Sequence, residues 1–212
     1  TMGIEDRRIQ YETAGLDIAD LNADPIVQLN HWYHQAEEAK VAEPNAMVLS
    51  TADALGHPDS RVVLARAIDK QGITFYTNHE SVKGMQISGE PRGAATFAWL
   101  DLHRQVRIRG VITKVEDAIS DAYFAVRPRA SQLGAWASPQ SQPITDRAKL
   151  DQLYSDVELR FNNVEVPRPP HWGGFTLSVE SIEFWQGKPN RLHDRFLYTR
   201  KIVGWQITRL AP

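Results

Sequence analysis

The stretch from residue 45 to residue 115 constrains the fold more than any other part of the chain. It contains five segments rich in β-branched and aromatic residues, separated by turn-forming patches such as ALGHPDS and DKQG. The five segments read NAMVLSTA, RVVLARAI, GITFYTN, GAATFAWL and RQVRIRGVITKV. Successive strands joined by short links pair antiparallel, so we predict an antiparallel meander that closes as a barrel.

Segments with helical periodicity flank this β-rich stretch. Asp24 and Pro25 supply an N-cap and a first-turn proline, and the apolar residues that follow recur at helical spacing. A short helix capped by Ser81 is the simplest interpretation of the link between the third and fourth strands. Helices are therefore predicted over residues 25–40, 116–126 and 146–161 as well as after Ser81. The fold class is mainly β with flanking helices.

Length and composition limit the kind of protein this is. The 212 residues fit one domain over residues 24–212, preceded by a polar, unpatterned N-terminal arm over residues 1–23. The 24 basic and 26 acidic residues give a net charge of −2, so bulk charge predicts no nucleic-acid partner. No run of apolar residues has the length of a membrane span or a signal peptide, and we therefore expect a cytoplasmic protein without a membrane partner.

Metal and cysteine chemistry receive no support from the sequence. Cysteine is absent, which excludes disulfides, thiolate metal sites and cysteine nucleophiles. The seven histidines form no recognisable ligand cluster. His31 and His34 lie one helical turn apart but lack a third ligand, so we expect a plain helix surface there and no metal site.

A cationic segment near the end of the chain, residues 183–198, reads EFWQGKPNRLHDRFLY. Its two halves have strand character and meet at a Gly-Lys-Pro-Asn turn, which predicts a hairpin. Arg191, His193 and Arg195 alternate, so in a strand all three would project from the same face and repel one another. Two interpretations stay open: a solvated edge strand neutralised by acidic neighbours, or a pocket for an anionic, electron-accepting small molecule.

Two further clusters are compatible with phosphate. Arg61 and Arg66 begin and end one predicted strand region, and Lys83 follows Ser81 at a predicted helix start, where backbone amides and a lysine suit a phosphate. A simple cap at Ser81 is the alternative.

The second cluster lies within YFAVRPRASQLGAWASPQSQ, residues 123–142, which we interpret as a loop stiffened by a proline. Arg127, with Tyr123 four residues before and Ser131 four residues after, forms a candidate oxyanion-binding surface; a basic surface loop is the alternative, and it is favoured for Arg129. Two phosphate sites indicate a phosphorylated cofactor and a phosphorylated substrate.

Several stretches, taken together and in this order, resemble the pyridoxamine 5'-phosphate oxidase family. They are DPIVQLNHW, PNAMVLST, SRVVLAR, FYTN, HRQV, RPRASQLGAWASPQSQ, WGGF, EFWQG, RLHDRFLY and the terminal RLAP. The resemblance covers nearly the whole chain, from about Arg8 to Pro212. It implies an FMN-binding split β-barrel that binds FMN at the interface of a homodimer. It also implies oxidation of pyridoxamine 5'-phosphate and pyridoxine 5'-phosphate to pyridoxal 5'-phosphate, with dioxygen as acceptor and hydrogen peroxide as product.

The resemblance assigns roles to residues that match the family's motifs. The implied cofactor contacts are Arg61, Arg66, Tyr76, Thr77, Lys83, Gln105, Gln140, Ser141, Trp185 and Arg195. The implied substrate contacts are Arg8, Tyr11, Arg66, Tyr123, Arg127, Ser131, Arg191 and His193. Arg191 and His193 lie over the reacting carbon and are the implied catalytic residues, and the arm from Arg8 to Tyr11 matches a segment that closes over the substrate.

The chain departs from the family pattern at two phosphate-contacting positions. Arg66 stands where lysine is usual, and Val82 stands where arginine is common, so we expect weaker cofactor or substrate affinity with the chemistry retained. Two other function classes stay open. One is a related split-barrel flavin oxidase of phenazine type, and the other is a non-catalytic binder of pyridoxal phosphate or flavin.

Overall fold

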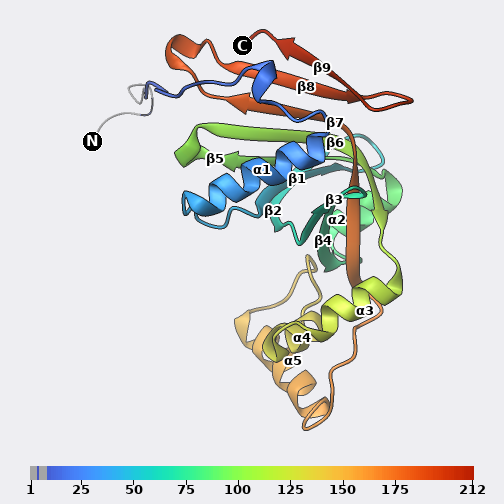
Figure 1. Ribbon diagram of the computed structural model, residues 1–212. Helices are drawn as coiled ribbons and strands as arrows, with labels where there is room; N and C mark the ends of the chain where they lie inside the picture. Colours follow the sequence, from blue (N-terminus) through green and yellow to red (C-terminus); the bar gives the residue numbers. More distant parts are fainter. Residues whose placement is uncertain (1–3, 5–8) are drawn as a thin grey trace.

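The fold is built on one nine-stranded sheet, seen in a computed structural model that describes residue 4 and residues 9–212 (Figure 1). Neighbouring strands in the order β2-β1-β5-β6-β7-β4-β3 are hydrogen-bonded, and β8 and β9 extend the sheet from β7. Each pairing among the described strands is antiparallel. The strands are β1 (Ala46–Ala52), β2 (Pro58–Leu64), β3 (Ala67–Asp69), β4 (Gly72–Asn78), β5 (Arg92–Trp99), β6 (Arg104–Lys114), β7 (Trp172–Gln186), β8 (Asp194–Arg200) and β9 (Trp205–Leu210).

Helices flank the sheet, and three of them form a separate lobe. The α-helices are α1 (Pro25–Glu38), α2 (Val82–Gly89), α3 (Asp117–Ala125), α4 (Arg129–Ala137) and α5 (Arg147–Arg160). Short 3-10 turns are η2 (Ile18–Asp20), η3 (Leu100–Leu102) and η4 (Pro189–Arg191). In Figure 1, α1 lies against the sheet. Helices α3, α4 and α5 project from the end of the molecule that is far from β8 and β9. The predicted helices at 25–40, 116–126, 146–161 and after Ser81 are confirmed, and Ser81 accepts a hydrogen bond from the Gly84 amide as the N-cap.

The strand order differs from the predicted meander. The segment predicted as one strand over residues 61–68 is two strands, because β2 ends at Leu64 and β3 begins at Ala67. Between them, the Ala65 amide donates to the Asn45 carbonyl and the Arg66 amide donates to the Thr74 carbonyl. The chain thus changes partner from β1 to β4 within two residues, and β2 and β3 occupy opposite edges of the sheet.

The cationic hairpin also differs from its prediction. Arg191 and His193 lie in the connection between β7 and β8, and of the three alternating cations Arg195 alone is within a strand. Asn190 and Arg191 have φ angles of 58° and 63°, in the left-handed region, so the backbone reverses there after Pro189 and the alternation of a strand does not apply.

One helix was missed by sequence reasoning. The segment interpreted as a stiffened loop folds as α4, with Pro128 at its N-cap position. A proline is tolerated at the start of a helix because the first amides have no intrahelical partner in any case. Arg129 does not lie free on a loop; its guanidinium donates to the carbonyls of Val164 and Phe161 and so ties α4 to the end of α5.

Strand β7 joins two hydrophobic cores. Near its end, Phe184 is fully buried in the main core together with Trp32 and Tyr198. At its beginning, Trp172 belongs to a smaller core inside the lobe, together with Phe124. The lobe is therefore held to the sheet by a strand that is buried at both ends.

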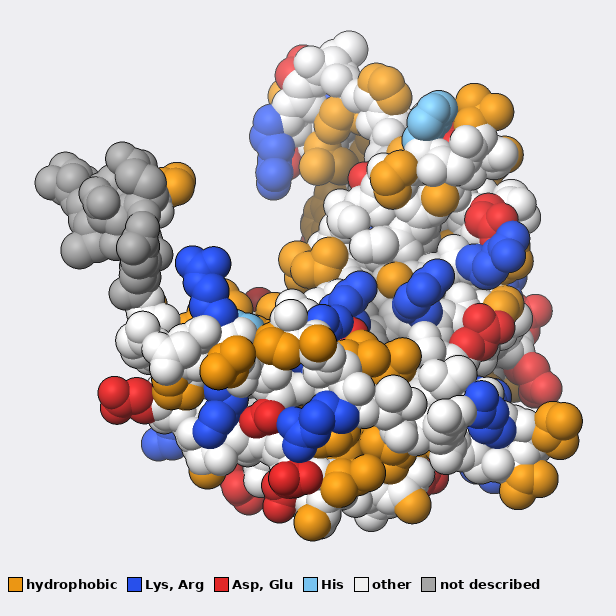
Figure 2. Space-filling view, turned by 90° about the horizontal axis from the view of Figure 1, so that it is seen from above, with side chains coloured by type: hydrophobic (Ala, Val, Ile, Leu, Met, Phe, Trp, Pro, Cys, Tyr) orange, Lys and Arg blue, Asp and Glu red, His pale blue; other side chains and the backbone are white. Residues whose placement is uncertain are grey.

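On the face that Figure 2 shows, cationic, acidic and hydrophobic side chains of the described residues are interspersed. Among residue 4 and residues 9–212, no helix combines the length and the hydropathy that crossing a membrane requires.

The contact between β4 and β7 gives a test of the fold. Gly72 has a φ of 131°, and a Cβ at this position would lie 2.0 Å from the Leu177 carbonyl oxygen. We expect Gly72→Ala to lower the free energy of unfolding by more than about 3 kcal/mol in urea denaturation, because backbone has to move. Gly56→Ala is the matched control, since its φ is 84° and no atom lies within 4 Å; it should cost about 1 kcal/mol. Equal losses in the two variants would contradict this packing.

Candidate functional site

A cationic cavity lies between the sheet and the lobe. Its volume is about 530 Å³, and its walls come from β2, β4, the start of α2, α3, α4 and the start of β7. Among the described residues that line it, Arg61, Arg66, Lys83 and Arg127 carry a positive charge and none is acidic. Because like charges repel in a partly dehydrated site, this cavity favours an anion.

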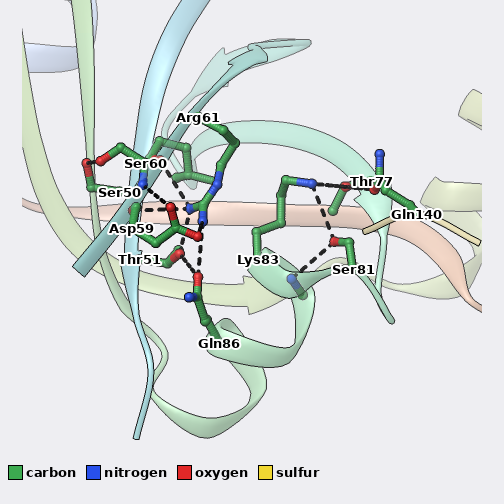
Figure 3. A network of polar contacts seen from close by, with 12 residues as sticks. Ser50, Thr51, Asp59, Ser60, Arg61, Thr77, Ser81, Lys83, Gln86 and Gln140 are labelled. Carbon is green, nitrogen blue, oxygen red and sulfur yellow. Dashed lines mark hydrogen bonds and ion pairs between the residues drawn. The ribbon is translucent and has the colours of Figure 1, made fainter. Parts of the chain in front are cut away.

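Lys83 is the buried cation of this cavity. Its ammonium donates to Thr77 Oγ1 at 3.2 Å, and to Ser81 Oγ and Gln140 Oε1 at 3.4 Å each (Figure 3). Within the described part of the chain, no carboxylate pairs with it. Burial, and then the nearby charge of Arg61, lower the pKa of Lys83. The three neutral acceptors hold the ammonium in place but leave its charge uncompensated.

Arg61 stands beside Lys83 with its guanidinium fixed. One nitrogen donates to Asp59 Oδ2 and another to Thr51 Oγ1, both at 2.6 Å, and Gln86 Oε1 accepts at 3.1 Å (Figure 3). The carboxylate of Asp59 partly neutralises Arg61, and the surrounding acceptors set its direction. A fixed guanidinium is suited to bind a phosphate because little conformational entropy remains to be lost.

Arg127 lies at the lobe side of the same cavity. Its guanidinium lies over the Trp172 ring at 4.4 Å, and burial lowers its pKa. One terminal nitrogen, Nη1, is buried without a hydrogen-bond partner. Tyr123 stacks on Tyr76 with ring centroids 3.9 Å apart. An orphaned charged donor beside a cavity without carboxylates is the arrangement that an anion's oxygen atoms would complete.

A second cavity lies at the C-terminal hairpin. Its volume is about 550 Å³, and it is lined by Ile9, Gln10, Tyr11, Trp185, Lys188, Asn190, Arg191 and His193. The rings of Trp185 and His193 are 4.5 Å apart, and Tyr11 stacks on His103 at 4.1 Å. The hairpin therefore does form a cationic cavity, although not by strand alternation.

His193 has a defined proton position in its neutral form. Its Nδ1 accepts a hydrogen bond from the Lys188 amide at 3.0 Å, so the ring proton is assigned to Nε2. Desolvation, and then the charge of Arg191, lower the pKa of His193 below its ordinary value of 6.5. At neutral pH the ring is uncharged and can donate through Nε2.

The remaining residues at this end lie in register with one another. Gln105 on β6 pairs with Trp185 on β7, which pairs with Arg195 on β8. Arg195 donates to Glu183 Oε1 at 2.8 Å. The neutralising role proposed for acidic neighbours thus applies to Arg195.

The two cavities lie at opposite ends of β7. Trp172 lines the first and Trp185 lines the second, and of residue 4 and residues 9–212 none lines both. Between these two residues the strand path is about 40 Å at about 3.3 Å per residue. Figure 1 shows β7 running from the helical lobe to the layer formed with β8. Within one chain, the predicted site residues are therefore brought together as two groups and not as one.

Most of the predicted site residues lie at one or the other of these two cavities. The first cavity collects Arg61, Arg66, Tyr76, Thr77, Lys83, Tyr123, Arg127, Ser131 and Gln140. The second end collects Tyr11, Gln105, Trp185, Arg191, His193 and Arg195. Ser141 is exposed, with a φ of 70°, and lies beside Gln140 without lining the cavity, while Arg8 lies outside the described residues.

Sequence reasoning missed two contributors. The ring of Trp172 packs against the guanidinium of Arg127. The backbone amide of Lys188 donates to His193 Nδ1 and so fixes the tautomer of His193. The tryptophan of WGGF belongs to a stretch quoted for the family resemblance but received no role of its own, and a backbone amide leaves no signal in a sequence. The described residues contain no group of three or more potential metal ligands that could hold an ion.

The antiparallel sheet and the cationic cavity beside it together define a β-barrel-like protein with a site suited to a phosphorylated ligand. A solved structure described as a pyridoxamine 5'-phosphate oxidase-related, FMN binding protein from Nostoc punctiforme shares this fold, with a TM-score of 0.70 and 17% identity over 91% of this chain and 100% of that chain. PhzG from Burkholderia lata, solved with tetrahydrophenazine-1-carboxylic acid, has a TM-score of 0.89 and 30% identity over 96% of this chain and 100% of its own.

The chain belongs to the pyridoxamine 5'-phosphate oxidase family. Residues 33–160 match the family model of that name, and residues 172–212 match the model of the pyridoxine 5'-phosphate oxidase C-terminal dimerisation region. Curated pyridoxine/pyridoxamine 5'-phosphate oxidases of Ralstonia pickettii and Burkholderia mallei are each 49% identical to it over 99% of both chains. The resemblance stated from the sequence, its split-barrel fold and its FMN cofactor are confirmed.

The uncompensated charge of Lys83 generates a prediction with two readouts. We expect Lys83→Met to weaken FMN binding about 10- to 100-fold, because a charge-assisted hydrogen bond to phosphate is lost. The cofactor-free protein should unfold at the same temperature or a higher one, since a buried unpaired charge is removed. Flavin fluorescence titration and thermal unfolding measure the two effects, with exposed Lys70→Met as control. Unchanged FMN affinity would show that Lys83 does not contact the phosphate.

Proposed function

We propose that this chain oxidises pyridoxamine 5'-phosphate and pyridoxine 5'-phosphate to pyridoxal 5'-phosphate, using FMN and dioxygen and releasing hydrogen peroxide. The membership of the family and the full-length identity to curated oxidases of that name support this activity. The observation that carries the proposal is the pair of cationic cavities. One has four cations and no carboxylate, and the other has a neutral imidazole beside an arginine.

The first cavity has groups for two phosphates. On the sheet side, Arg61, Lys83 and Thr77 form a fixed donor cluster that suits the FMN phosphate. On the lobe side, Arg127 offers its orphaned nitrogen, with Ser131 also lining the wall, and suits the phosphate of the substrate. Arg66 lines the same cavity and its charge lowers the pKa of Arg127, so it lies near enough to serve either anion.

We infer that a homodimer assembles each complete site from two chains. The hairpin cavity of one chain is too far along β7 from its own phosphate cavity for one flavin to contact both. In a two-fold symmetric dimer, the hairpin of each protomer would lie at the phosphate cavity of its partner, so two complete sites would form. The match of residues 172–212 to a dimerisation region supports this arrangement, because those residues include β7, β8 and β9.

The residues of the hairpin have separate tasks in this reaction. When bound, FMN supplies the acceptance of a hydride equivalent from the substrate C4' and its delivery to dioxygen. Arg191 contributes a fixed positive charge that orients the substrate and stabilises developing negative charge. His193 donates a hydrogen bond from its Nε2–H to a substituent of the pyridine and keeps this proton, so the ring stays uncharged at neutral pH. Trp185 and Tyr11 limit the access of water to the cavity.

Flavin reduction in the absence of oxygen tests the function directly. We expect pyridoxamine 5'-phosphate to bleach the visible flavin absorption band of the purified protein, and Arg191→Leu to slow this bleaching about 100-fold or more with FMN still bound. Exposed Arg147→Leu on α5 is the control. A protein that binds FMN but is bleached by neither phosphate ester would instead fit an oxidase of another pathway. Tight binding of pyridoxal phosphate without flavin would fit a non-catalytic binder.

A further inference from the structure

A segment near the N-terminus forms one wall of the hairpin cavity. Residues 9–17 have no regular secondary structure, yet Ile9, Gln10 and Tyr11 line that cavity together with Arg191 and His193. A wall without helix or strand hydrogen bonds depends on the contacts that dock it. The position of residues 9–17 therefore sets the shape of the cavity on that side.

Several docking contacts reach the connection between β7 and β8. Thr13 Oγ1 donates to the Gly187 carbonyl at 2.6 Å, and the Lys188 ammonium donates to the Thr13 carbonyl at 3.3 Å. The Asn190 amide donates to Gln10 Oε1 at 3.2 Å. All three involve neutral acceptors; the two that Thr13 makes are partly buried, and the one between Asn190 and Gln10 is exposed.

Asp194 supplies a different kind of contact. Its Oδ2 accepts the backbone amide of Leu16 at 3.0 Å, and its Oδ1 accepts Arg209 Nη1 on β9 at 2.7 Å. Its side chain is 18% exposed, so this carboxylate is mostly removed from water. Arg209 also pairs with Asp17 at 3.3 Å. The carboxylate of Asp194, the residue that follows His193, thus joins the N-terminal segment to the last strand.

The N-terminal segment is shaped to reach this carboxylate. Gly15 has a φ of 86°, in the region that favours glycine. A Cβ at this position would lie 2.7 Å from Asp194 Oδ2 and 3.0 Å from the Lys188 side chain. The turn at Gly15 therefore needs both the left-handed backbone and the absence of a side chain to bring the Leu16 amide to Asp194.

We propose that Asp194 is a positioning residue that latches residues 9–17 over the hairpin cavity and so controls the affinity for substrate. This inference rests on the proposed function, because it deepens the role of the same cavity. Asp194 acts through the docked segment and through the adjacent His193, and it does not line the cavity itself. With the latch open, the wall that carries Tyr11 is no longer held against Arg191.

Two single variants and their combination test the latch. Asp194→Asn weakens it from the hairpin side, and Gly15→Ala weakens it from the segment side. We expect each to raise the KM for pyridoxamine 5'-phosphate about tenfold, to affect kcat less than KM, and to speed hydrogen exchange of the Leu16 amide about tenfold or more. The double variant should exceed the stronger single variant by less than twofold, because both act on one contact. Asp151→Asn, which removes an exposed ion pair on α5, is the control and should change nothing.

The possible results separate the latch from the function. If both single variants keep normal KM and normal Leu16 exchange, or if their effects multiply in the double variant, the latch is wrong. If Asp194→Asn fails to fold, Gly15→Ala still decides the question. Hydrogen exchange can be measured without turnover. If the unmodified protein shows no oxidase activity, the proposed function is wrong. The exchange rates of the variants would still test the latch.

Discussion

The length and burial of β7 are the constraint on which the rest of the structure depends. The strand is anchored by Trp172 in the core of the lobe and by Phe184 in the main core, so its two ends cannot approach each other without unfolding one of them. Each end carries one cationic cavity. The same strand that stabilises the lobe therefore keeps the two cavities apart within a chain, and this separation is the basis of our proposal that a complete site is assembled from two chains.

The phosphate cavity is positively charged because neutral groups, and not carboxylates, surround two of its cations. Lys83 and Arg127 are held by hydroxyl, amide and aromatic groups, where a protein selected for stability alone would place carboxylates or apolar side chains. Asp59 neutralises Arg61 on one side only. Arg61 places a like charge near Lys83, and Arg66 places one near Arg127; an anion in the cavity would relieve both repulsions, so binding and stability make opposite demands on these residues.

Local signals in the sequence predicted most elements, and long-range contacts account for what they missed. The cap at Ser81 and the apolar period after Pro25 act over one or two turns, so the helices were found. The division of the predicted 61–68 strand depends on Asn45 and Thr74, which lie 20 and 8 residues from their partners, and no local pattern reveals it. The family resemblance implied roles for residues on which spacing was silent, and these roles stay predictions, whereas the orphaned nitrogen of Arg127 and the tautomer of His193 needed coordinates.

Subunit complementation tests the two-chain site most directly. Arg127→Ala removes a group from the phosphate cavity and Arg191→Leu removes one from the hairpin cavity, so each homodimer would have two defective sites. If sites form between chains, random mixing after reversible unfolding makes about half of the dimers mixed, and one of the two sites in each mixed dimer is intact. The account predicts recovery of about a quarter of the unmodified activity. A mixture no more active than the average of the two variants would contradict it.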